Sequence, residues 1–67
     1  MISKIQNIAN ETQYNSNKEK FVSALYWNLV AAGLKPCIVN DKYIELDGVD
    51  YHFIKNRRSC TYTVAIV

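Results

Sequence analysis

Apolar residues between Ser16 and Gly33 recur at three- and four-residue spacing, which is the period of an α-helix. Ser16 and Glu19 have the spacing of a capping box, which predicts that the helix begins at Ser16. Gly33 can adopt the left-handed conformation that ends a helix, and Pro36 prevents the helix from continuing. We therefore predict a helix over 16–33 with a broad apolar core face. That face consists of Phe21, Val22, Leu25, Tyr26, Leu29 and Ala32.

The opposite side of this predicted helix is also largely apolar. It carries Ala24, Trp27 and Ala31, interrupted by polar residues such as Lys20 and Ser23. A helix that is apolar nearly all round is either covered twice within its own domain or offers its second face to another chain. Interface hot spots are enriched in tryptophan, and alanines let a partner approach closely. We therefore predict a partner-binding face at Ala24, Trp27 and Ala31.

A shorter helix is predicted for the N-terminal residues. Apolar residues recur there at helical spacing up to about Glu11, which indicates an amphipathic helix that extends the same core. The segment 10–16, NETQYNS, has no apolar period, and its residue types favour turns. Residues 1–15 are therefore expected to form a short helix and a polar connector. The apolar residues of the short helix are Ile2, Ile5, Ile8 and Ala9.

After Pro36 the apolar pattern changes to alternation, which is typical of β-strands. Asp47 and Gly48 between two of the runs are a strong hairpin signal, because a type I′ turn needs positive φ at both central positions. We predict a four-stranded antiparallel meander in the order 1-2-3-4 over 36–67. With the helices on one face, residues 1–67 form a single small α+β domain. The predicted strands are Cys37–Val39, Lys42–Leu46, Val49–Lys55 and Cys60–Ile66.

The two best-marked turns predict a register for the sheet. The two-residue turn pairs Ile44 with Tyr51, and a four-residue turn at 56–59 pairs Phe53 with Tyr62. Both pairings place apolar side chains on the same face, so that the other face is expected to meet solvent. The residues expected on that solvated face are Ile38, Tyr43, Glu45, Asp50, His52, Ile54, Thr61, Thr63 and Ala65.

Few residues of the chain could carry out chemistry. His52 is the single histidine, and Cys37 and Cys60 lack CxxC spacing. Neither a nucleophile beside a base nor a set of metal ligands can be assembled, and no Gly-rich phosphate loop is present. We therefore expect a non-enzymatic protein with no catalytic residue, cofactor, metal or small-molecule substrate. We expect two reduced, partly buried thiols, because two intervening strands separate them beyond disulfide reach.

A basic cluster marks the last predicted turn. Lys55, Arg57 and Arg58 lie in the segment KNRRS, and the meander places Lys42 at the same end of the sheet. Acidic residues collect toward the other end, so that the strands carry a charge gradient along their length. This basic tip is suited to phosphates or to an acidic protein surface, and its alternative role is solubility alone.

The last predicted strand has an unprotected edge. Residues 61–67, TYTVAIV, contain no charge, proline or glycine, although natural edge strands usually carry protection against further pairing. Thr61, Thr63 and Ala65 are therefore a second predicted partner-binding site. The alternatives for its cover are the same strand of a second copy, a strand of another protein, or the N-terminal segment of this chain.

Composition narrows the setting in which this protein works. The net charge of +2 is too small to indicate a nucleic-acid binder by itself. No segment has the length of a membrane span or the pattern of a secretory signal, so we expect a cytoplasmic protein without membrane contact. Abundant Asn, Ile, Lys and Tyr indicate an AT-rich coding sequence, which fits a phage or mobile-element product.

These features support three hypotheses about function. The leading one is a protein–protein interaction module, of the kind found in viral inhibitors or accessory proteins that occlude a larger host protein, and a homodimer is expected. The alternative is a small nucleic-acid-binding domain that uses the basic tip with Tyr43 and Tyr26. The third is an oligomer-forming structural protein.

Overall fold

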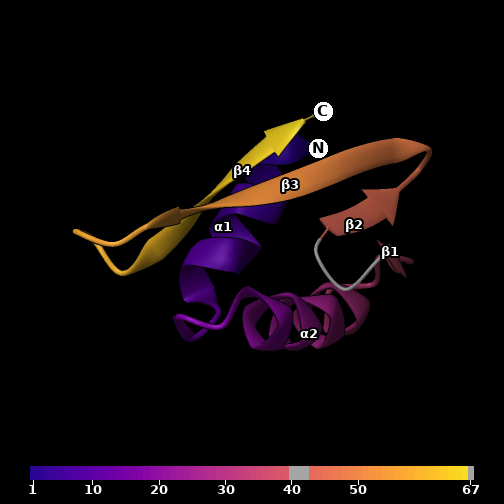
Figure 1. Cartoon of the computed structure of the whole chain (residues 1–67). Helices are drawn as coiled ribbons and strands as arrows, with labels where there is room; N and C mark the ends of the chain where they lie inside the picture. Colours follow the sequence, from indigo (N-terminus) through magenta and orange to yellow (C-terminus); the bar gives the residue numbers. More distant parts are fainter. Residues whose placement is uncertain (40–42, 67) are drawn as a thin grey trace.

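The computed structural model describes residues 1–39 and 43–66. Two helices precede a four-stranded antiparallel sheet whose strand order is β1-β2-β3-β4, and both helices lie against the same face of the sheet (Figure 1). The α+β class and the meander order predicted from the sequence are confirmed. Neither helix in the described residues is long and apolar enough to cross a membrane. The elements are α1 (Ile2–Glu11), α2 (Lys18–Ala31), β1 (Cys37–Val39), β2 (Tyr43–Leu46), β3 (Val49–Asn56) and β4 (Thr61–Ile66).

Helix α2 begins two residues later than its predicted start. Asn17 is the N-cap, and its side-chain oxygen accepts hydrogen bonds from the backbone amides of Glu19 at 3.0 Å and Lys20 at 3.3 Å. The predicted capping box that starts at Ser16 is therefore wrong. The asparagine oxygen satisfies two of the first free amides of the helix at once, which leaves Ser16 outside it.

The end of α2 follows the predicted chemistry. Gly33 has φ 86°, and its amide donates to the carbonyl of Val30 at 3.0 Å. The amide of Leu34 donates to the carbonyl of Leu29 at 3.1 Å. These two bonds form a Schellman motif, which needs the left-handed conformation that glycine adopts without strain. The last helical residue is Ala31, two residues before the glycine.

The turn between β2 and β3 confirms the first predicted register. Asp47 and Gly48 have φ values of 53° and 78°, and Ile44 lies opposite Tyr51. Both central residues have the positive φ that a type I′ turn requires. The Asp47–Gly48 dipeptide therefore predicted both the turn and the β2–β3 register correctly.

The register between β3 and β4 differs from the prediction by two residues. Phe53 lies opposite Val64 rather than Tyr62, and Asn56 extends β3 to pair with Thr61. The turn occupies 57–60, and Cys60 enters the left-handed region at φ 52°. Because the shift is an even number of residues, every side chain keeps its predicted face.

Strand β1 also departs from one expectation. Ile38 lies opposite Ile44 and packs against the core, although it was expected on the solvated face. The pairing of Cys37 with Glu45 causes this, because it turns alternate residues of the short strand toward the helices. Asn40, Asp41 and Lys42, including the predicted first residue of the second strand, lie outside the described residues.

The core lies between one face of the sheet and the two helices. At its centre the ring of Phe21 stacks on Tyr62 with 3.9 Å between ring centroids. The Tyr62 hydroxyl donates to the carbonyl of Asn15 at 2.6 Å, so that its polar end is satisfied within the connector between the helices. The buried apolar residues are Ile5, Ala9, Phe21, Val22, Leu25, Leu29, Ile44, Leu46, Tyr51, Phe53, Tyr62 and Val64.

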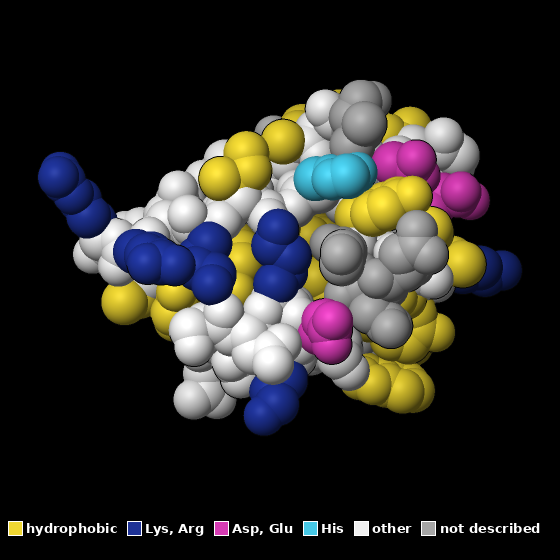
Figure 2. Space-filling view, in the orientation of Figure 1, with side chains coloured by type: hydrophobic (Ala, Val, Ile, Leu, Met, Phe, Trp, Pro, Cys, Tyr) yellow, Lys and Arg dark blue, Asp and Glu magenta, His cyan; other side chains and the backbone are white. Residues whose placement is uncertain are grey.

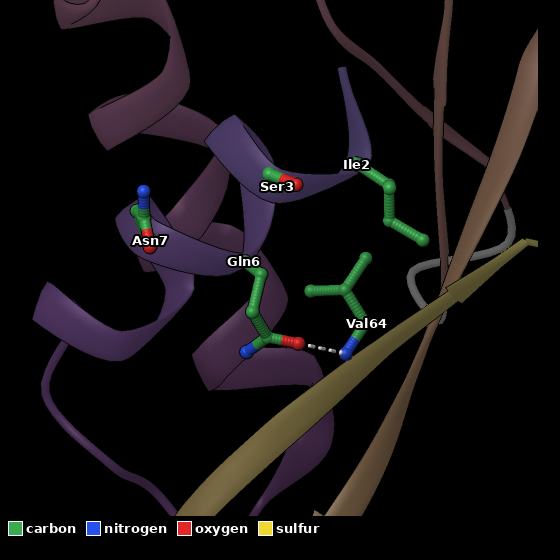
Figure 3. Close-up of a pocket in the computed structure, with 5 residues that line it drawn as sticks. All are labelled: Ile2, Ser3, Gln6, Asn7 and Val64. Atoms are coloured by element: carbon green, nitrogen blue, oxygen red, sulfur yellow. Dashed lines mark hydrogen bonds between the residues drawn. The ribbon is translucent and has the colours of Figure 1, made fainter.

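Helix α1 covers the outer edge of β4 with one side chain. The Gln6 amide nitrogen donates to the Tyr62 carbonyl at 3.0 Å. The Gln6 oxygen accepts from the Val64 amide at 2.8 Å, the bond drawn in Figure 3. A glutamine thus makes the two bonds that a neighbouring strand would make at this point of the ladder. The N-terminal segment therefore protects part of the edge that lacks charge and proline.

We predict that Gln6→Glu lowers the free energy of unfolding by about 1–2 kcal/mol. The carboxylate can still accept from the Val64 amide, but it places a second acceptor against the Tyr62 carbonyl. Urea denaturation measures the change, and Gln13→Glu is the control because it adds the same charge at an exposed connector residue. Equal stability of the two variants would contradict the role given to Gln6.

A second prediction concerns alkaline pH. Burial, with a smaller contribution from the nearby Tyr14, raises the pKa of Tyr62 above its ordinary value. The folded state therefore favours the neutral Tyr62 phenol. The stability that this preference contributes is fully present below the ordinary tyrosine pKa of about 10, and it is lost as the pH rises through the raised pKa of the folded state. Tyr62→Phe should cost about 1 kcal/mol at neutral pH through the lost bond to Asn15.

The pH dependence separates ionisation from packing. Between pH of about 9 and about 11, Tyr62→Phe should lose less stability than the wild type, since it has no phenol to ionise at this site. Thermal unfolding across this range provides the measurement. Tyr43→Phe is the matched control, because it removes a hydroxyl from the opposite face of the sheet. Parallel curves for wild type and Tyr62→Phe would refute the assignment.

Candidate functional site

The outward side of α2 presents apolar side chains to solvent. The Trp27 side chain is 65% exposed and Val30 is 41% exposed, while Ala24 and Ala31 are also exposed. Tyr26 contacts the indole edge to face, with 5.1 Å between ring centroids and 83° between planes, which supports the indole from one side. We call Ala24, Trp27, Val30 and Ala31 the outer face of α2. The structure thus brings the three residues of the predicted helix site together on one surface.

The two ends of this face differ in charge. Lys20 is exposed one turn before Ala24. At the other end Glu11 and Ala31 line one groove of about 390 Å³, which lies between the last turns of α1 and α2. The side-chain amide of Asn28 donates to the Thr12 hydroxyl at 2.9 Å, and this bond fixes the end of α1 beside α2. The face therefore runs from a lysine at its start to a glutamate beside its end.

The second predicted site lies on β4. Its residues Thr61, Thr63 and Ala65 alternate with Tyr62 and Val64, whose backbone groups point outward to Gln6. The backbone groups of the three predicted residues therefore point toward β3, and their side chains lie on the face of the sheet away from the helices. The backbone groups that face outward along this edge include the Tyr62 carbonyl and the Val64 amide, and Gln6 already bonds both of them. Another strand could pair at these positions only if Gln6 moved away.

A shallow groove accompanies this covered edge. It has a volume of about 330 Å³ and runs between α1 and β4 (Figure 3). The bond from the Val64 amide to Gln6 crosses the groove and joins its two walls. The groove is therefore the outer surface of the contact that holds α1 on the sheet. Its lining residues are Ile2, Ser3, Gln6, Asn7 and Val64.

The basic tip is only partly free. The Lys55 ammonium donates to the Ser16 carbonyl at 2.6 Å, which ties the hairpin to the connector before α2. Arg57 and Arg58 are exposed in the turn, and Lys42 lies outside the described residues. Figure 2 shows a group of Lys and Arg side chains at this end of the molecule, while acidic side chains lie toward the middle and the opposite end, where another basic side chain also lies. The tip thus presents two exposed arginines.

The sheet face away from the helices carries an aromatic pair. Tyr43 and His52 stack with 4.4 Å between ring centroids and 12° between planes, and Ile54 on the same face is 55% exposed. Tyr26, which the nucleic-acid hypothesis combined with Tyr43, lies in the helical layer on the other side of the sheet. The structure therefore divides the two tyrosines between separate surfaces.

The described residues contain no group of three or more His, Cys, Asp or Glu side chains that could hold a metal ion. Cys37 and Cys60 are free and exposed. The expectation that both thiols are partly buried is wrong, because Cys37 lies on the solvated face opposite Glu45 and Cys60 lies in the last turn.

Sequence reasoning missed three residues that shape these surfaces. Val30 belongs to the outer face of α2, and its position three residues after Trp27 was a signal for it. Gln6 and Glu11 carried no local signal, since their roles depend on how α1 packs against the rest of the chain. Comparison of the chain with family models, curated proteins and solved structures found no match.

Proposed function

We propose that this chain is a small protein–protein interaction module that binds through the outer face of α2. The observation that carries the proposal is Trp27, a tryptophan that is 65% exposed between two exposed alanines. Large apolar side chains grouped on one surface mark interaction sites, and tryptophan is enriched among the residues that dominate binding energy.

The energy available at this face is considerable. Burying the exposed part of one indole removes on the order of 150 Å² from water, which is worth about 3–4 kcal/mol. Ala24 and Ala31 flank the indole and lose little side-chain entropy on binding, so that a partner can approach the helix closely. The outer face of α2 therefore has one large central side chain, Trp27, flanked by the small side chains of Ala24 and Ala31, which is an arrangement suited to a binding hot spot.

The mode of action that fits this arrangement is steric. A rigid helix on a small domain can cover a surface of a larger protein and exclude that protein's other ligands. We propose the role of an inhibitor or accessory protein, and the AT-rich residue usage favours a phage or mobile element as its setting.

The proposal predicts that Trp27→Glu abolishes capture of the partner. Immobilised full-length protein is exposed to a lysate of the native host cell, and retained proteins are quantified by mass spectrometry. A partner anchored by Trp27 should be reduced at least about 30-fold, the equivalent of a loss of about 2 kcal/mol. Gln13→Glu adds the same charge at an exposed connector residue and should retain the partner.

Folding must be unchanged for this comparison to count. Because Trp27 is exposed, Trp27→Glu should alter the free energy of unfolding by no more than about 0.5 kcal/mol. Circular dichroism and urea denaturation check this. A retained set of proteins that is the same for wild type and Trp27→Glu would reject the outer face of α2 as the binding site.

A second candidate function is binding of single-stranded nucleic acid. The observation that favours it is the stacked pair of Tyr43 and His52 on the open face of the sheet, because His52 lies on β3, the strand that leads to the exposed Arg57 and Arg58. Proteins that bind single strands combine aromatic surfaces with basic grooves. This surface is separate from the outer face of α2, so the two candidates respond to different substitutions.

For this second candidate, Arg57→Ala combined with Arg58→Ala should weaken oligonucleotide binding equally across sequences, because a short turn contacts phosphates and not base edges. The slope of log affinity against log salt should flatten by about 1.4 on single strands. Fluorescence anisotropy measures it. Lys4→Ala combined with Lys35→Ala removes the same charge elsewhere and should leave the slope unchanged. No binding by the wild type at low salt would eliminate this candidate.

A further inference from the structure

Ala24, Trp27 and Ala31 of the outer face of α2 lie, together with Lys20, on a line of residues whose spacing is the same when it is followed from either end. Lys20, Ala24, Trp27 and Ala31 are separated by four, three and four residues. At the rise of an α-helix this line is about 16 Å long. When a second α2 lies antiparallel on the first, about a twofold axis at the middle of the line, Ala24 of each copy faces Trp27 of the other and Lys20 faces Ala31.

This pairing matches large side chains with small ones. Trp27 is 65% exposed, and Ala24, one turn before Trp27, has only a small side chain and leaves space beside the indole. Across the twofold axis each indole lies over the alanine of the other copy, so that both indoles are covered by one arrangement. Twofold interfaces require self-complementary surfaces of this kind, in which residue i contacts j and j contacts i.

Charge gives a second, independent match. Antiparallel packing brings Lys20 of one copy to the end of α2 in the other, where Glu11 lines the same groove as Ala31. The last turn of α2 contains no basic residue of its own, and a cation is favoured at the C-terminal end of a helix. Lys20 of the incoming copy supplies that cation and faces the Glu11 carboxylate. The symmetry repeats this contact at both ends.

We infer that in the free protein the outer face of α2 is covered by a second copy of this chain, bound antiparallel about a twofold axis, which a larger protein partner has to displace. Trp27 of each copy packs on Ala24 of the other, and Lys20 of each copy faces Glu11 of the other. The inference rests on the proposed function, since it takes the outer face of α2 as the binding surface. It adds the occupant of that surface when no larger protein is bound, and the geometry of that complex.

A charge exchange tests this geometry. Sedimentation equilibrium of the full chain is measured from about 1 μM to about 1 mM, because an interface made by one face of a single helix is expected to dissociate in the micromolar range. Lys20→Glu and Glu11→Lys should each weaken the dimer about tenfold, since each replaces two attractive contacts with two repulsive ones. The double variant should return to within about threefold of the wild type, because it restores opposite charges at both ends.

The controls separate this result from a general charge effect. Lys4→Glu makes the same charge change at an exposed residue near the start of α1 and should leave the dimer unchanged. Trp27→Glu should give a monomer at every concentration. Circular dichroism of each variant verifies the fold, which should persist because Glu11, Lys20 and Trp27 are all exposed.

Three results would overturn the inference. They are a wild type that stays monomeric throughout the series, a dimer that survives Trp27→Glu, and a double variant that binds no better than either single one. These failures are distinct from failure of the proposed function. A monomeric wild type that still captures a different protein through Trp27 would reject the second copy and leave the outer face of α2 as an interaction site.

Discussion

Tyr62 is the residue on which the tertiary structure depends, because it joins four segments of the chain. Its ring stacks on Phe21 of α2, and its hydroxyl bonds the carbonyl of Asn15 in the connector. Its own backbone carbonyl accepts from Gln6 of α1. One residue of β4 therefore holds both helices and the segment between them. In a chain this small, where burial is limited, such a shared contact makes the helices and the sheet fold as one unit.

This arrangement decides which surfaces remain open. Both helices are committed to one face of the sheet, so that the other face and the outward side of α2 meet solvent (Figure 1). Part of the β4 edge is closed at the same time, because Gln6 takes the place of a neighbouring strand. Of the two partner sites expected from the sequence, the β4 edge is thus partly covered by the chain itself, whereas the outer face of α2 is exposed.

The remaining surfaces differ in the interactions that they can make. The outer face of α2 is apolar with a charge at each end, which suits a shaped protein surface. The open face of the sheet carries a stacked aromatic pair and leads to two exposed arginines, which suits a flexible anionic chain. The two lie on opposite layers of the molecule, so that each can be altered without disturbing the other.

Local chemistry in the sequence was sufficient for the element types, the meander order and the first hairpin. Asp47 and Gly48 determine a turn by their own backbone preferences, and helical periodicity alone placed Ala24, Trp27 and Ala31 on one side of α2. The β3–β4 register was not determined in this way. A shift of two residues keeps every side chain on its face, so that the apolar pattern is the same in both registers.

Contacts between distant residues were decided only by the tertiary structure. Gln6 and Val64 are separated by 58 positions, and no local preference of a glutamine indicates that it will complete a strand edge. The place of Glu11 beside Ala31 likewise depends on the angle at which α1 meets α2. The sequence by itself therefore determined which faces are apolar, because side-chain periodicity is local. Packing decided which of those faces stay exposed, because burial is a property of the whole chain.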